Sequence, residues 1–180
     1  MVQYLQEIPD FRRAQGRRFE LHYILLFSLM ATLSGATSYR DIQRFIQTHF
    51  ELLQKVFFLK WKRPPGHVSL RTNLMGVRAE DLEKALRSHS LQLLDISDGT
   101  HIAVDGKALR GSADHLKDKK ALHLLSAFAT NGDIILAHLK TDDKSNEIKA
   151  FQKLLTELKL KNVVYTLDAM HCQKKLLNSF

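Results

Sequence analysis

The chain has 180 residues, of which 44% are hydrophobic and 26% are charged, so it is long enough to form one or two globular domains with a substantial core. Its formal net charge of +8 favours a polyanionic partner, either nucleic acid or an anionic membrane surface. The most apolar segment, Tyr23 to Gly35, holds about a dozen residues where a membrane span needs roughly twenty, and Cys172 is the only cysteine, which excludes an internal disulfide. The N-terminus lacks the order of charged, apolar and small residues of a secretory signal, so we expect a cytoplasmic protein without a membrane partner.

Apolar residues recur at helical spacing before Asp95 and predict a helical bundle over residues 1–95. These positions are Leu21, Ile24, Leu25, Leu29, Leu33, Ile42, Phe45, Ile46, Leu82, Leu86 and Leu93. A helix from about Leu21 to Leu33, a turn at 35–37 and a second helix from Tyr39 outline a helix-turn-helix. Ser38 and Asp41 form a capping-box pattern at the start of the second helix. The loop 61–66, which contains Pro64-Pro65-Gly66, divides the bundle in two.

Two sets of polar residues in this half are candidates for DNA contact. The first set recurs at spacings of three and four along the second helix and consists of Arg40, Gln43, Arg44 and Gln47. Such a polar face could read or clamp DNA. The alternative to base reading is an ordinary helical hairpin whose polar face is simply solvated. The second set is a denser cluster, Arg12, Arg13, Arg17 and Arg18, which we expect to be a flexible basic arm that binds phosphates without reading sequence.

Short apolar runs rich in Val, Ile and Leu predict a sheet over residues 96–180. The four runs cover residues 102–104, 122–129, 134–139 and 163–167. Asn131-Gly132 is a strong hairpin signal and predicts that the second and third strands are antiparallel. Ser145-Asn146 predicts the start of a helix whose inner face consists of Ile148, Phe151, Leu154, Leu155 and Leu158. Because a crossover helix precedes it, the fourth strand can pair parallel to the first. The expected fold is therefore α+β, a helical bundle followed by an incomplete ribonuclease H-like mixed sheet.

Two of these strands end in an aspartate that is followed by a small residue, Asp105 and Asp168. Parallel neighbouring strands would bring both carboxylates to one edge of the sheet. Such a pair is a usual arrangement for holding magnesium. Lys107 and Arg110 follow the first aspartate and are candidates for phosphate contact. The alternative is that both side chains are simply solvated.

Several motifs resemble those of the DDE transposases of the bacterial H-repeat-associated and related insertion-sequence type. They are Ile8-Pro-Asp-Phe-Arg-Arg13 with Gly16-Arg17-Arg18, Gly35-Ala-Thr-Ser-Tyr-Arg-Asp-Ile42, Val104-Asp-Gly-Lys-Ala-Leu-Arg-Gly-Ser112, Lys144-Ser-Asn-Glu-Ile148 and Thr166-Leu-Asp-Ala-Met-His-Cys-Gln173. They cover nearly the whole chain in the family's order. The resemblance implies an N-terminal transposase-associated domain over 1–95 and a catalytic domain over 96–180. It also implies strand transfer on double-stranded DNA at transposon ends, with Asp105 and Asp168 as the first two acids of a triad that holds magnesium or manganese.

The chain departs from the family pattern because no Asp or Glu follows Asp168. Full-length relatives continue to a catalytic Glu, so we expect a truncated copy with little or no catalysis and weak or absent metal binding. Two alternatives remain. A non-catalytic DNA-binding protein could occupy transposon ends or interfere with a full-length transposase, alone or as a homo-oligomer. An unrelated metal-dependent nuclease with a different third ligand is disfavoured by the motifs.

Overall fold

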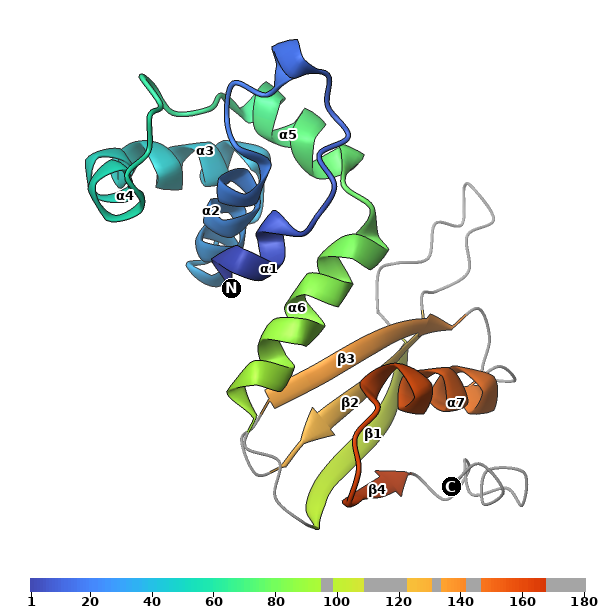
Figure 1. Cartoon of the computed structure of the whole chain (residues 1–180). Helices are drawn as coiled ribbons and strands as arrows, with labels where there is room; N and C mark the ends of the chain where they lie inside the picture. Colours follow the sequence, from blue (N-terminus) through green and yellow to red (C-terminus); the bar gives the residue numbers. More distant parts are fainter. Residues whose placement is uncertain (95–98, 109–122, 131–133, 142–146, 168–180) are drawn as a thin grey trace. The chain divides into compact units, whose positions relative to one another are not determined.

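The computed structural model describes residues 1–94, 99–108, 123–130, 134–141 and 147–167 (Figure 1). The chain divides into two compact units, Met1–Leu86 and Arg87–Phe180. Each unit has its own cluster of buried apolar side chains. Within the described ranges, no helix is both long enough and apolar enough to cross a membrane.

The first unit is built from helices. They are α1 (Val2–Gln6), the 3-10 helix η1 (Ala14–Gly16), α2 (Leu21–Leu33), α3 (Tyr39–Thr48), α4 (Phe50–Phe57), α5 (His67–Gly76) and the first part of α6 (Ala79–Leu93). Helix α2 is the central element, and its residues Ile24, Phe27 and Ala31 have no exposed surface. An apolar helix that is buried on most of its circumference belongs in a core. The sequence prediction of a core helix over this segment is therefore confirmed.

The turn between α2 and α3 has the predicted chemistry. Gly35 has a φ of 93°, a conformation that side chains rarely adopt, which explains the glycine at this position. Ser38 is the N-cap of α3, and its hydroxyl accepts a hydrogen bond from the backbone N–H of Asp41 at 3.2 Å. The same hydroxyl donates to the Asp41 carboxylate at 2.7 Å. The predicted helix, turn and capped second helix are all present.

Trp61 anchors the loop between α4 and α5 although it lies in an irregular segment. Its side chain is buried and packs edge-on against Phe19 and Phe27, with ring centroids 5.0 and 5.7 Å apart. The indole Nε1–H donates to the carboxylate of Glu20, so the polar end of the ring is also satisfied. The loop is therefore fixed to α2 and the segment before it.

Helix α6 supplies residues to both units, and one sequence prediction fails there. Leu93 was expected on the inner face of the bundle, but its side chain is 60% exposed. The buried stripe changes phase along the helix: Ala85 belongs to the first core, whereas Leu94, just beyond the helix, belongs to the second. Spacing alone assumes a single core and cannot detect this change of partner.

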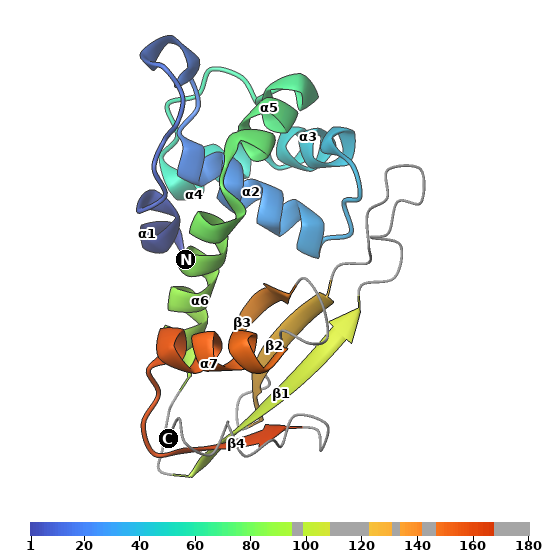
Figure 2. The same ribbon diagram turned by 90° about the vertical axis from the view of Figure 1, so that its right-hand side faces the viewer.

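The described residues of the second unit comprise the last part of α6 and a mixed four-stranded sheet with a helix packed on it (Figure 2). Its elements are β1 (Thr100–Ala108), β2 (His123–Ala129), β3 (Ile134–Thr141), α7 (Glu147–Leu158) and β4 (Val163–Leu167). The strand order is β3-β2-β1-β4, with β4 parallel to β1 and the other neighbours antiparallel. The antiparallel pairing of β2 with β3 and the parallel pairing of β4 with β1 are the predicted ones, and the fold is α+β with a partial ribonuclease H-like sheet. The expected Asn131-Gly132 turn lies outside the described residues.

The core of this unit lies between the sheet and α7. Alternate residues of the strands point toward the helix, as the burial of Val104, Leu125 and Leu139 shows. Helix α7 contributes Phe151, Leu154 and Leu158 as predicted, Leu155 is half-buried, and the side chain of Ile148 lies outside the described residues.

Strand β3 carries a β-bulge opposite the junction of Ala127 and Phe128. Ala127 pairs with Ala137 and Phe128 pairs with Ile135, so Leu136 is an extra residue on β3. The Leu136 side chain is only 1% exposed and fills the core. The bulge therefore adds one residue to the strand while the pairing continues in phase on both sides.

Candidate functional site

Asp105 lies on β1 directly after the buried Val104, and its own side chain is exposed. In the parallel pairing of β1 with β4, Val104 is the register partner of Leu167. Each of these two residues is followed in the sequence by an aspartate, Asp105 and Asp168. Asp168 and Arg110 lie outside the described residues, so the approach of the two carboxylates stays a prediction.

Asp105 begins a row of polar residues that crosses the sheet. Its register partner on β2 is Ser126, and the partner of Ser126 on β3 is His138. Residues directly opposite each other in antiparallel strands share one face, which here is the face away from the buried core of α7. The Ser126 hydroxyl lies 2.9 Å from His138 Nδ1, within hydrogen-bond distance. Neither residue stands out in the sequence, because a serine and a histidine within apolar runs reveal their common face only once the register is known.

Lys107 is exposed two residues after Asp105 on the same strand, so the two side chains project from the same face. The sequence predicted that this strand ends at Asp105, but β1 continues to Ala108, so Asp105 lies within the strand. Phosphate contact by Lys107 stays a prediction. No group of three or more His, Cys, Asp or Glu side chains suited to a metal ion occurs in the part of the chain that the structure describes. The carboxylate of Asp105 is nevertheless a hard oxygen ligand of the kind that magnesium and manganese prefer, and it fits such an ion chemically.

The arginine-rich segment after α1 differs from the flexible arm that the sequence suggested. Arg12 binds both carboxylate oxygens of Asp10 at 2.8 Å through Nε and Nη2, and its Nη1 donates to Asn73 of α5 at 2.9 Å. The Arg12 side chain is only 8% exposed. Arg17 donates to the backbone carbonyls of Asp10 and Arg12 at 3.1 and 2.9 Å and closes the loop. The segment is thus folded around an internal ion pair.

This ion pair changes the acidity of Asp10. The side-chain hydrogen bonds from Arg12 lower the pKa of Asp10 from 3.8 to about 2, and the backbone N–H of Arg12 adds to the effect. Arg13 and Arg18 remain exposed on the outside of the loop, and Arg18 also lies over the Phe19 ring at 5.7 Å. The four arginines therefore divide into two groups, with Arg12 and Arg17 fixing the loop and Arg13 and Arg18 facing solvent.

The polar face of α3 divides in a similar way. Arg40, Arg44 and Gln47 are exposed, and Arg44 lies 3.6 Å from Asp41. Gln43, in contrast, accepts a hydrogen bond from the backbone N–H of His67 at 2.8 Å. Since His67 is the first residue of α5, Gln43 satisfies one of the free N–H groups at that helix end. Its place on the polar face therefore has a structural explanation, which helical spacing could not reveal.

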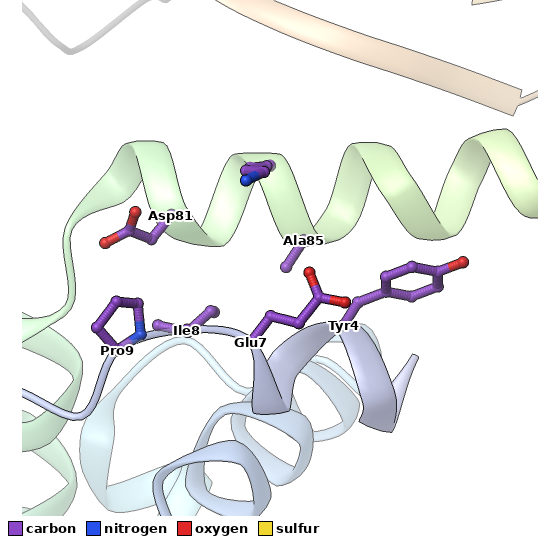
Figure 3. A pocket seen from close by; sticks show the side chains of 7 residues that line it. Tyr4, Glu7, Ile8, Pro9, Asp81 and Ala85 are labelled. Carbon is purple, nitrogen blue, oxygen red and sulfur yellow. The ribbon is translucent and has the colours of Figure 1, made fainter.

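A small cavity of about 150 Å³ lies within the first unit, between α1 with the residues after it and α6 (Figure 3). It is lined by Tyr4, Glu7, Ile8, Pro9, Asp81, Lys84 and Ala85. The lining includes two carboxylates and one ammonium group. It includes none of the candidate residues for catalysis or DNA contact. The cavity gives no reason to revise the candidate sites.

Comparison with known proteins matches both halves of the chain to transposase families. Residues 2–90 match the family described as "DDE_Tnp_1-associated", and residues 96–180 match the "Transposase DDE domain". No solved structure matches the chain.

Curated relatives from Escherichia coli K12 match along nearly the full chain. "Putative protein YbfL" is 33% identical over 98% of this chain and 46% of its own length. "H repeat-associated putative transposase YhhI" is 32% identical over 98% of this chain and 46% of its own. "Putative transposase YncI" is 34% identical over 98% of this chain and 71% of its own. The chain thus spans about half the length of the first two relatives.

Proposed function

Because this chain belongs to the H repeat-associated DDE transposases, we propose that it acts on transposon-end DNA, with DNA contacts in the first unit and the first carboxylates of the catalytic centre in the second. The observation that carries the proposal is the parallel register of β1 and β4. It pairs Val104 with Leu167, and an aspartate follows each of them in the sequence. A shared sheet edge is where two acidic ligands could meet one divalent ion.

In this proposal, Asp105 and Asp168 would hold magnesium or manganese. A divalent ion bound there would supply Lewis-acid stabilisation of phosphodiester oxygens. Lys107 and Arg110 would bind phosphate beside the carboxylates. Within the 180 residues no acid follows Asp168, so we infer that metal binding by these residues alone is weak and that a third ligand strengthens it.

The DNA contacts of the first unit follow from which cations are free to make them. Arg13 and Arg18 are exposed and make no ion pair within the described residues, so they are assigned to phosphates. Arg12 keeps its guanidinium on Asp10 and Asn73 and acts as a positioning residue for this loop. Arg40 and Arg44 on α3 are assigned to the DNA duplex because both are exposed, although Arg44 also lies 3.6 Å from Asp41. The side-chain oxygen of Gln43 is taken by its bond to the His67 N–H.

The test measures Mn²⁺ binding by calorimetry and Mn²⁺-dependent nicking of duplexes that carry the ends of the encoding element. It compares the 180-residue chain with the same chain extended by the corresponding later segment of YhhI. We expect weak Mn²⁺ binding by the chain, tighter binding and nicking by the extended protein, and loss of both in Asp105→Asn and Asp168→Asn. Glu51→Gln, which removes an exposed carboxylate of α4, is the matched control.

Unchanged Mn²⁺ binding in both aspartate variants would overturn the assignment of the metal site. DNA binding without nicking in the extended protein would instead support the non-catalytic alternative, in which the protein only occupies transposon ends.

A further inference from the structure

Phe58 is placed where a phenylalanine costs the protein stability. It follows α4 as the C-cap residue with φ 52° and ψ 41°, a left-handed conformation that glycine or asparagine normally supplies at a helix end. Its side chain is also 88% exposed, so the ring contributes almost nothing to the core. Backbone strain and an exposed aromatic ring at one position are characteristic of functional sites rather than of packing.

The backbone on both sides of Phe58 is fixed. The N–H of Leu59 donates to the carbonyl of Gln54 at 3.1 Å, and the Gln54 side chain donates to the carbonyl of Trp61 at 2.7 Å. On the other side, the Tyr23 hydroxyl donates to the carbonyl of Phe57 at 3.3 Å. With the buried Trp61 three residues further on, the ring of Phe58 is presented from an anchored turn. An aromatic side chain on an anchored backbone loses little further conformational entropy when it binds a ligand.

The chain around Phe58 carries one sign of charge. Residues 52–79 contain six lysines and arginines and no aspartate or glutamate. Four of these cations lie within five residues of Phe58, and all four are exposed: Lys55, Lys60, Lys62 and Arg63. None of the four makes an ion pair with another described residue. The ring is therefore surrounded in sequence by cations that a polyanion could neutralise.

We propose that Phe58 is a stacking platform for an unpaired DNA base, with Lys55, Lys60, Lys62 and Arg63 binding the phosphates on either side. Aromatic rings within a basic surface bind single strands in this way, because every base offers an apolar face while its backbone offers phosphates. The inference rests on the proposed function, since it takes DNA as the ligand, and it adds a preference for DNA whose pairing is open.

The charge also argues against the main alternative occupant, a second copy of this chain. Leu52 and Val56 are exposed on the same helix and would extend an apolar contact beyond Phe58. A symmetric contact through this surface would, however, bring the same cations of two copies together, and like charges repel. A DNA strand, in contrast, offers a base to the ring of Phe58 and phosphates to the nearby cations.

The experiment measures binding of the full chain to a labelled duplex and to the same duplex with a short unpaired stretch that contains 2-aminopurine. We expect wild-type protein to prefer the open duplex and to quench the 2-aminopurine fluorescence by stacking. Phe58→Ala should weaken binding to the open duplex by about 5- to 100-fold while changing binding to the paired duplex little. Phe58→Trp should retain the preference.

Two further variants separate stacking from a structural or protein-contact role. Phe58→Asn suits the left-handed conformation, so it should keep or raise the urea midpoint while losing the preference for open DNA. Leu52→Ala removes exposed apolar surface from α4 without touching the stacking ring and should bind both duplexes like wild type.

The inference is overturned if Phe58→Ala binds open and paired duplexes as wild type does. It is also overturned if Leu52→Ala and Phe58→Ala both convert a sedimenting dimer to a monomer without altering DNA affinity, because the apolar surface would then be a protein contact. Failure of wild-type protein to bind any duplex would instead contradict the proposed function.

Discussion

Asp10→Asn tests whether the arginine segment is held by its internal ion pair. The substitution keeps the size of the side chain and one oxygen acceptor but removes the charge that faces the Arg12 guanidinium. Arg12 is 8% exposed and keeps only neutral oxygen acceptors, Asn73 Oδ1 at 2.9 Å among them. A nearly buried cation without its counter-ion destabilises the folded state.

The pKa of Asp10 sets the size of the effect. The gap between 3.8 and about 2 converts to about 2.4 kcal/mol at about 1.36 kcal/mol per tenfold change in proton affinity. The Asp10 side chain is 25% exposed, so solvent screening reduces the figure, and we expect a loss of about 1 to 2 kcal/mol at neutral pH. With a urea slope of about 1–3 kcal/mol/M, the midpoint should fall by roughly 1 M.

The sign of the pH dependence follows from the lowered pKa. Because the folded protein favours the carboxylate, the contribution of Asp10 is complete above roughly pH 5 and is lost as the pH falls through 3.8 toward 2. The difference in unfolding free energy between wild type and Asp10→Asn should therefore be constant from pH 5 to 7 and shrink toward pH 2. Urea denaturation followed by Trp61 fluorescence measures it, since Trp61 is buried in the same unit.

Glu51→Gln is the control, because it removes one negative charge from an exposed position of the same unit. It should change the free energy of unfolding by less than about 0.5 kcal/mol at every pH. A difference between wild type and Asp10→Asn that does not change between pH 5 and pH 2 would refute the role of the ion pair.

Three other variants test separate features. Ser38→Ala should destabilise the first unit by about 1 kcal/mol in urea denaturation, because it removes the cap of α3. An equal effect of Thr48→Ala, at the exposed end of the same helix, would argue against capping. Leu154→Ala should cost about 2–5 kcal/mol in the second unit, because it empties a fully buried position under the sheet; hydrogen exchange of the β2 amides reports it, and a loss below about 1 kcal/mol would contradict the packing. Replacing Arg13 and Arg18 by Ala should lower the magnitude of the slope of log affinity against log salt by about 1.8 for duplex DNA. Arg12→Lys should lower stability and leave this slope unchanged. A changed slope in Arg12→Lys with an unchanged slope in the Arg13 and Arg18 variant would show that Arg12 contacts the DNA.

Local patterns predicted much of the fold. Helix α2 ends where the apolar spacing ends and before the Gly35 turn, and β4 occupies the predicted run of Val163 to Leu167. The parallel pairing of β4 with β1 followed from the helix between β3 and β4. Each of these features depends on neighbours in the sequence or on a general rule of chain connection, and so could be read without a structure.

Contacts between distant residues could not be read in this way. The bond from Gln43 to the start of α5 joins positions 24 residues apart, and the bond from Arg12 to Asn73 joins positions 61 apart. Spacing placed these side chains on polar surfaces, and only packing shows that they are occupied. The two cores touched by α6 misled the prediction for Leu93 in the same way, because the sequence does not say which neighbour a helix turn will meet.

The bulge in β3 bears on how this family can change in length. In a regular strand, gaining or losing one residue rotates every later side chain to the opposite face, which here would carry His138 away from the side of Asp105. Leu136 is already an extra residue without a register partner, and the residues on both sides of it keep their pairing and their faces. Related proteins that lack one residue at this point can therefore keep their polar row intact, at the expense of some core volume. Gaps in β3 among transposases of this type should accordingly gather at the position of Leu136.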